Sequence, residues 1–196
     1  MIAAVAAVAC EGLVQGAPPK PNVLFILSDD QRFDTIHALG NAEIQTPNVD
    51  KLVERGFVFN NAYCQGGLSQ AVCAPSRAMI LTGRSVFHAP DWNQKPANPT
   101  LGQVMTEAGY DTLYAGKKSN SYIAGNEAFA KCVYTDDHVV ENEKQDENSD
   151  AAQQPRLMAD AATSFMHADH GGKPVFMFLA PHYPHEPRVA PKKFMD

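Results

Sequence analysis

The chain has few cysteines, a small share of basic residues and no long hydrophobic run, and each shortage removes a class of protein. Its four cysteines show no Cys-x-x-Cys pair, which argues against a zinc site or a disulfide scaffold. No internal apolar segment reaches the length of a membrane-spanning helix. With 16 basic against 22 acidic residues, the net charge of -6 disfavours a nucleic-acid partner. The 196 residues, 44% of them hydrophobic, suit one domain with a real core.

Residues 1–19 differ from the rest of the chain and read as a signal-like leader with a proline-rich spacer. The alanine-rich apolar run is too short to span a bilayer and matches the core of a secretory signal, although no Lys or Arg precedes it. Small residues before Ala17 suit cleavage, so we expect export to the periplasm or the extracellular space. Cys10 offers a lipid anchor as one alternative, and a tail without a targeting role is another.

Apolar runs alternate with helix-like segments along the remaining residues, 20–196, which we treat as one domain. We expect strands at 22–28, 57–63, 110–117 and 175–180, and helices at 47–55, 73–82, 101–108 and 151–168. The alternation predicts an α/β fold with a mainly parallel sheet flanked by helices, and continuous apolar runs indicate buried strands. The acidic stretch 135–150 is predicted to be an exposed loop.

Polar side chains follow three of the predicted strands at the point where each strand ends. Asp29 and Asp30 follow the first strand, Lys117 ends another, and His182 and His185 follow the last. In parallel sheets, ligands bind beyond the carboxyl ends of the strands. We therefore expect two carboxylates, an amine and two imidazoles at one edge of the sheet.

Cys73 begins a predicted helix that carries Pro75 near its start and ends before Gly83. The start of a helix stabilises an anion, and Arg77, one turn on, adds a bidentate grip on oxyanion oxygens. A cysteine phosphatase needs five residues between its Cys and Arg, and Met79 stands where that arginine would be. No marker favours a papain-like protease. A buried structural cysteine stays open but does not explain the Pro-Ser-Arg order.

Residues 73–84 read CAPSRAMILTGR, which resembles the signature of the type I, formylglycine-dependent sulfatases. The likeness continues in four further stretches, PNVLFILSDDQ, TPNVDKLVERGFVFNNAY, AGYDTLYAGK and PVFMFLAPHYPHEP. The resemblance implies the sulfatase fold of the alkaline phosphatase-like superfamily. Residues 20–196 would then be the N-terminal part of the catalytic domain, truncated at the C-terminus.

The resemblance implies that Cys73 is a precursor. In the family a formylglycine-generating or anaerobic sulfatase-maturating enzyme oxidises this cysteine to an aldehyde. One hydroxyl of the hydrated aldehyde attacks sulfur, and the second expels sulfate and restores the aldehyde. Asp29, Asp30 and the modified residue 73 would bind one divalent cation, Ca²⁺ (calcium) in the family, through hard oxygen ligands.

The resemblance also assigns roles to the other residues at the sheet edge. Arg77 would hold the hydrate, Lys117 would contact the sulfate or the leaving oxygen, and His182 would serve the leaving group. His185 would line the substrate pocket. The family usually continues Gly-Lys-Trp-His after the lysine strand, whereas Ser119 stands at the place of that histidine. The family's later metal ligands and second lysine have no counterpart in this chain.

Three functions remain on these grounds. The first is a sulfuric ester hydrolase that acts on a sulfate ester, for which a sulfated carbohydrate is our choice. The second is a catalytically incomplete sulfatase fragment without activity. The third is a phosphate or phosphonate ester hydrolase of the same superfamily. The triplet Asp169-His170-Gly171 is interpreted as a turn at a helix end and not as metal ligands.

Overall fold

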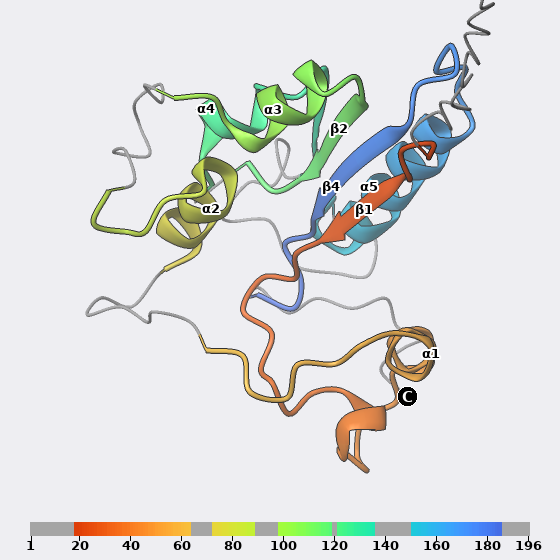
Figure 1. Cartoon of the computed structure of the whole chain (residues 1–196). Coiled ribbons are helices and arrows are strands. Elements are labelled where there is room, and N and C mark those ends of the chain that lie inside the picture. Colours follow the sequence, from red (N-terminus) through yellow and green to blue (C-terminus); the bar gives the residue numbers. More distant parts are fainter. Residues whose placement is uncertain (1–17, 64–71, 89–97, 119–120, 136–149, 186–196) are drawn as a thin grey trace, which may run out of the picture.

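The computed structural model describes residues 18–63, 72–88, 98–118, 121–135 and 150–185. These residues form one four-stranded parallel sheet with the order β1-β4-β2-β3 (Figure 1). The strands are β1 (Val23–Ile26), β2 (Asp111–Gly116), β3 (Lys131–Tyr134) and β4 (Val175–Ala180). The helices are α1 (Pro47–Arg55), α2 (Cys73–Thr82), α3 (Leu101–Glu107), α4 (Ile123–Asn126) and α5 (Asp150–Met166), with a 3-10 turn, η1, at His37–Leu39. The predicted α/β fold with a parallel sheet is confirmed.

The sheet lies between two helical layers, each with its own apolar core. On one face, α2, α3 and α4 pack over a cluster that includes Leu81, Tyr114 and Phe178. On the other face, α5 packs over β2 and β4 and buries Phe165 against Met177 and its neighbours. Figure 1 shows α5 behind β1 and β4 on one side of the sheet, and the three shorter helices on the other side, to the upper left of β4. No helix in the described ranges is long and apolar enough to cross a membrane.

The position of each strand follows from how apolar it is. All six residues of β4 are buried, because the strand lies between two neighbours and under helices on both faces. The prediction of a buried strand at 22–28 is wrong in its burial, because β1 lies at the sheet edge. Leu24 is 52% and Ile26 54% exposed, since α5 packs on β2 and β4. Among the residues that the structure describes, no helix covers the face of β1 that carries Leu24 and Ile26.

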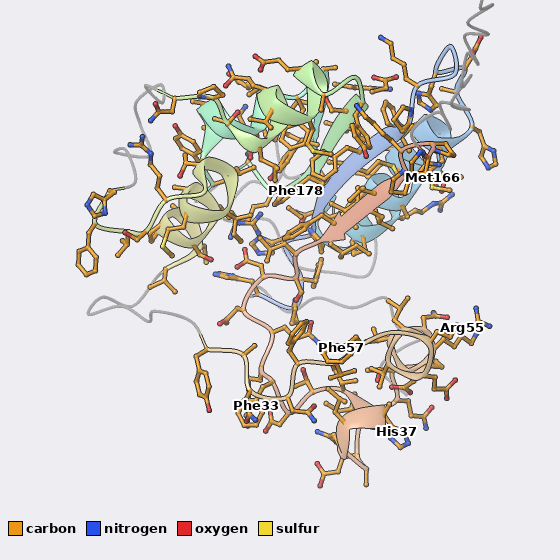
Figure 2. All side chains as sticks on the ribbon, in the orientation of Figure 1. Phe33, His37, Arg55, Phe57, Met166 and Phe178 are labelled. Atoms are coloured by element: carbon orange, nitrogen blue, oxygen red, sulfur yellow. The ribbon has the colours of Figure 1, made fainter. Side chains whose placement is uncertain are left out.

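The predicted strand at 57–63 does not form. Phe57 and Tyr63 are 81% and 90% exposed, and an extended apolar segment becomes a strand only where another strand pairs with it. Phe57 instead meets Phe59 edge to face, with 5.0 Å between ring centroids. Figure 2 shows Phe57 and Phe33 in the lower part of the molecule, well away from Phe178 in the core.

The ends of the helices differ in how their backbone groups are capped. Thr100 and Gln103 form a reciprocal capping box at the start of α3, and the Thr100 N–H donates to the Gln103 amide oxygen at 2.7 Å. Gly83 ends α2 in the left-handed conformation, with φ 65°. Thr46 precedes α1 but does not cap it through its side chain, because its hydroxyl donates to the Asp50 carboxylate at 2.7 Å.

The turn predicted at Asp169-His170-Gly171 follows α5 and forms a small polar junction at the amino edge of the sheet. His170 Nδ1 lies 2.7 Å from Asp111 Oδ2, and Nε2 lies 2.7 Å from the Phe165 carbonyl oxygen. Both partners are acceptors, so only the protonated ring can donate to both. The hydrogen bond to Asp111 raises the pKa of His170 above its usual value, and the Phe165 carbonyl adds to this against partial desolvation.

This junction predicts a stability that declines at alkaline pH. Because the pKa of His170 is higher in the folded chain, its contribution is complete below the unfolded value of about 6.5 and is lost as the pH rises through the folded value. Urea denaturation at roughly pH 6 and pH 9 measures this change. We expect the free energy of unfolding to fall less between these two pH values in His170→Gln than in the wild type. His167→Gln, at an exposed position nearby, is the control. Parallel pH profiles for His170→Gln and the wild type would contradict the assignment.

Candidate functional site

The carboxyl edge of the sheet brings together residues from both halves of the chain. Asp29 follows β1, Lys117 follows β2, and the segment 181–185 follows β4, which lies between those two strands. The Asp29 N–H donates to the Tyr183 carbonyl oxygen at 3.3 Å, and Asp29 forms an isolated parallel bridge with Pro184. The loop after β4 is thus tied to the loop after β1, and the predicted convergence at this edge occurs.

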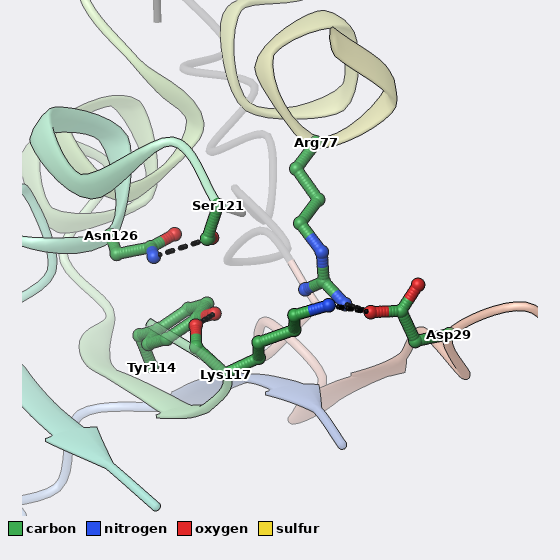
Figure 3. Close-up of polar contacts among 6 residues, drawn as sticks. All are labelled: Asp29, Arg77, Tyr114, Lys117, Ser121 and Asn126. Atoms are coloured by element: carbon green, nitrogen blue, oxygen red, sulfur yellow. Dashed lines mark hydrogen bonds and ion pairs between the residues drawn. The ribbon is translucent and has the colours of Figure 1, made fainter. Parts of the chain in front are cut away.

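Three buried charges meet at one carboxylate oxygen (Figure 3). Lys117 Nζ lies 2.7 Å from Asp29 Oδ2, and Arg77 Nη2 lies 3.3 Å from the same atom. Lys117 is 0% exposed, Asp29 5% and Arg77 2%. Charges this far from water persist only when they are paired, so the two cations and the carboxylate hold one another in place.

Cys73 completes this group from the start of α2. Burial by itself raises the pKa of the Asp29 carboxyl, but hydrogen bonds from Lys117 and Cys73 and the charges of Lys117 and Arg77 outweigh it, so the pKa is lowered. The pKa of the Cys73 thiol is raised, first by burial and then by the hydrogen bond to Asp29 and the negative charge of that residue. The charges of Lys117 and Arg77 lower it by less. An unmodified Cys73 is therefore a protonated thiol and a poor nucleophile.

Arg77 retains a hydrogen-bonding group that the described residues do not use. Its Nη1 atom is buried and has no partner among them, while Nη2 contacts Asp29. A buried guanidinium donor without an acceptor costs free energy, and the planar group suits an oxyanion with two oxygens. The arrangement can bind an anionic group next to Cys73.

The remaining predicted site residues lie around this centre with different exposure. Asp30 is exposed and adopts a left-handed conformation, with φ 59°, so it does not join the buried charges. His182 and His185 are half-buried, and their ring centroids lie 4.9 Å apart at a tilt of 53°. Ser119 lies outside the described residues.

The donors around the two carboxylates determine how far they fit a cation. In the ranges that the structure describes, no three His, Cys, Asp or Glu side chains gather in a way that could hold a metal ion. Asp29 and Asp30 supply hard oxygen donors, but Asp29 Oδ2 already contacts two positive charges. These residues fit part of a cation site and do not complete one.

Two buried polar features at the same edge were missed in the sequence. The Tyr114 hydroxyl donates to the Lys117 carbonyl oxygen at 2.6 Å, inside the aromatic core. The Asn126 amide donates to Ser121 Oγ at 2.8 Å, and both residues are buried (Figure 3). The Tyr114 hydrogen bond has only a weak signal in the sequence, a tyrosine within an apolar run. The Asn126–Ser121 bond has none, because Ser and Asn are usual in loops.

Comparisons with known proteins agree with this arrangement. The model of the Sulfatase family matches residues 21–196. The ulvan-active sulfatase of Formosa agariphila is 34% identical over 102 residues, which cover 50% of this chain and 20% of the relative. The chain spans about a fifth of the length of the curated relatives it matches.

Solved structures show the same fold. A protein solved with its substrate D-glucosamine-2-N,6-O-disulfate superposes with a TM-score of 0.65 at 23% identity, over 85% of this chain and 35% of that one. The phosphonate monoester hydrolase of Agrobacterium radiobacter also gives 0.65, at 19% identity, over 89% of this chain and 43% of that one. The family match, the parallel sheet and the charged centre beside Cys73 lead to one conclusion: the chain belongs to the sulfatase family.

Proposed function

We propose that the chain is the N-terminal catalytic part of a sulfuric ester hydrolase, whose nucleophile is a hydrated formylglycine made from Cys73. The observation that carries this proposal is the position of Cys73, which hydrogen-bonds to Asp29 beside two buried cations. A thiol with a raised pKa makes a poor nucleophile in this place. Residue 73 needs another functional group there, and the CAPSRAMILTGR motif supports the aldehyde.

The residues around position 73 suit the chemistry of an aldehyde hydrate. Asp29 is ionised and accepts a hydrogen bond from the Cys73 side chain, so a hydroxyl on that carbon would find the same acceptor. One hydroxyl gives up its proton and attacks sulfur while the bond from sulfur to the alcohol oxygen breaks. The second hydroxyl then gives up its proton, the bond from carbon to the sulfate oxygen breaks, and the aldehyde returns. Lys117 and Arg77 would offset the negative charge on the sulfuryl oxygens.

We assign the protonation of the leaving group to residues of the loop that follows β4. His182 would donate a proton or a hydrogen bond to the departing alcohol, and His185 would line the substrate pocket. The backbone bond between Asp29 and Tyr183 supports this assignment, because it holds the loop beside the buried charges.

A divalent cation, Ca²⁺ by family likeness, is part of the proposal. Asp29, Asp30 and the modified residue 73 would contribute ligands, and the remaining ligands would come from outside the described residues. When bound, such an ion supplies Lewis-acid chemistry to the sulfate oxygens.

The substrate, partners and destination of the protein are also proposals. A sulfated carbohydrate is supported by the fold shared with a protein solved with D-glucosamine-2-N,6-O-disulfate. The formylglycine would require a maturation enzyme as a partner, and the leader supports export, with Cys10 as a lipid anchor in the alternative case.

Two alternatives are supported by specific observations. The fold shared with a phosphonate monoester hydrolase favours a phosphate or phosphonate ester substrate. The partial cation site among the described residues favours the second alternative, a catalytically incomplete sulfatase without activity.

The proposal is tested by the mass of the peptide that contains residue 73 and by a paired assay. In protein from its native cell, we expect conversion of the thiol to the aldehyde to lower the peptide mass by roughly 18 Da. The same protein should release sulfate from an aryl sulfate faster than phosphate from the matching phosphate ester. A Cys73→Ala chain is the control, for which neither the mass change nor sulfate release is expected. An unmodified cysteine in protein that still hydrolyses the sulfate ester would overturn the nucleophile assignment.

A further inference from the structure

Tyr114 carries a hydroxyl that the packing of its ring does not require. The residue is fully buried, and its ring lies 5.7 Å from Phe178 and 5.9 Å from Phe129, measured between centroids. A phenylalanine would fill this space equally well. The hydroxyl instead donates to the Lys117 carbonyl oxygen at 2.6 Å, so it serves the residue that ends β2.

The backbone of Lys117 is held on both sides where it leaves the sheet. Its N–H donates to the Ala180 carbonyl oxygen of β4 at 2.9 Å, and its carbonyl accepts from Tyr114. The preceding residue, Gly116, approaches β4 so closely that a side chain there would overlap the Ala180 carbonyl group. The two bonds fix both peptide planes that flank the Lys117 α-carbon, and with them the direction in which the side chain leaves it.

That direction matters because Lys117 reaches a residue that follows a strand two places away in the sheet. Its ammonium group crosses the end of β4 to contact Asp29 Oδ2 at 2.7 Å. A lysine side chain has four rotatable bonds, so a shift at its backbone moves the ammonium group unless other contacts hold it. Figure 3 shows Tyr114 to the left of Lys117, next to its backbone, and Asp29 at the far end of the lysine side chain.

We propose that Tyr114 is a positioning residue for Lys117. Its hydroxyl fixes the Lys117 carbonyl, and thereby holds the ammonium group at Asp29, where the sulfate ester would bind. The contribution to catalysis rests on the proposed function, whereas the contribution to the position of Lys117 does not.

The experiment measures the two contributions separately in Tyr114→Phe, which keeps the ring and removes only the hydroxyl. In protein labelled with ¹⁵N-lysine, the rate at which the Lys117 ammonium protons exchange with water reports the contact with Asp29. We expect this rate to rise about tenfold in Tyr114→Phe. Lys117→Met identifies the signal by its loss. Tyr134→Phe is the matched control, because it removes a hydroxyl from a ring that contacts Tyr114 but lies outside the Tyr114–Lys117 bond.

Sulfate ester hydrolysis provides the second readout. We expect kcat to fall about 10-fold to 100-fold in Tyr114→Phe with KM little changed, and both to be unchanged in Tyr134→Phe. An unchanged exchange rate in Tyr114→Phe would overturn the inference, and so would a chain that no longer folds, since the hydroxyl would then serve the whole core. If the wild type hydrolyses no sulfate ester, the proposed function fails, while the exchange rates still decide the role of Tyr114.

Discussion

Replacing Asp29 by asparagine is expected to lower the free energy of unfolding by about 3–5 kcal/mol. The substitution leaves Lys117 and Arg77 buried at 2.7 and 3.3 Å from an oxygen that no longer carries a charge. A buried cation without a counter-charge is costly because the chain cannot return it to water without unfolding. Urea denaturation followed by circular dichroism measures the difference.

Asp30→Asn is the matched control for this prediction. Asp30 is the next residue and has the same side chain, but it is exposed, so its replacement should change the free energy of unfolding by less than about 0.5 kcal/mol. Equal losses for the two variants would show that the buried charges do not depend on Asp29.

The loss of folding stability at acidic pH gives a further check on the role of Asp29. Because the pKa of its carboxyl is lowered in the folded chain, its contribution is complete above the unfolded value of about 3.9 and is lost as the pH falls through the folded value. The wild type should therefore lose more stability than Asp29→Asn when the pH is lowered through this range.

Replacing Gly116 by alanine is the second change with a large expected effect, a loss of about 3 kcal/mol or more in the free energy of unfolding. The new Cβ would lie 2.5 Å from the Ala180 carbonyl carbon, which belongs to the backbone of the adjacent strand and cannot rotate away. The glycine also has φ 146°, a conformation that L side chains rarely adopt.

Gly171→Ala separates steric overlap from backbone strain. Gly171 also has a positive φ, 58°, but nothing lies within 4 Å of a Cβ placed there. Its replacement should cost only about 1 kcal/mol, from the left-handed conformation alone. If Gly116→Ala were no more destabilising than Gly171→Ala in thermal unfolding, the close packing of β2 on β4 would not be as tight as described.

The local sequence pattern predicted which candidate residues follow the strand ends but not how exposed each of them is. Asp29 and Asp30 have the same side chain and follow the same strand, so local pattern treats them alike. Asp30 adopts a positive φ, whereas Asp29 forms a bridge with Pro184, in a loop more than half the chain away. Long-range contacts of this kind leave no trace in local periodicity.

The order of the strands in the sheet could not be predicted from local sequence either. The apolar runs that form β2 and β4 were predicted from their composition, but composition does not say which strand pairs with which. The segment 57–63 begins with the apolar, strand-favouring run Phe-Val-Phe and yet pairs with no described strand. The short β3 and α4, four residues each, were missed because one turn or one short strand gives too few positions for a period to appear.

The central position of β4 fixes the order in which this site can form. Residues 22 and 175, joined where β1 and β4 begin, are 153 positions apart in the chain, and β1 contacts β2 only through β4. Until the last strand of the described chain emerges during synthesis, no strand lies between β1 and β2 to hold Asp29 and Lys117 at the same edge of one sheet. Any shortened product that ends before β4 is therefore expected to lack the site entirely instead of holding a weakened version of it, and the late closure of so long a loop predicts slow folding.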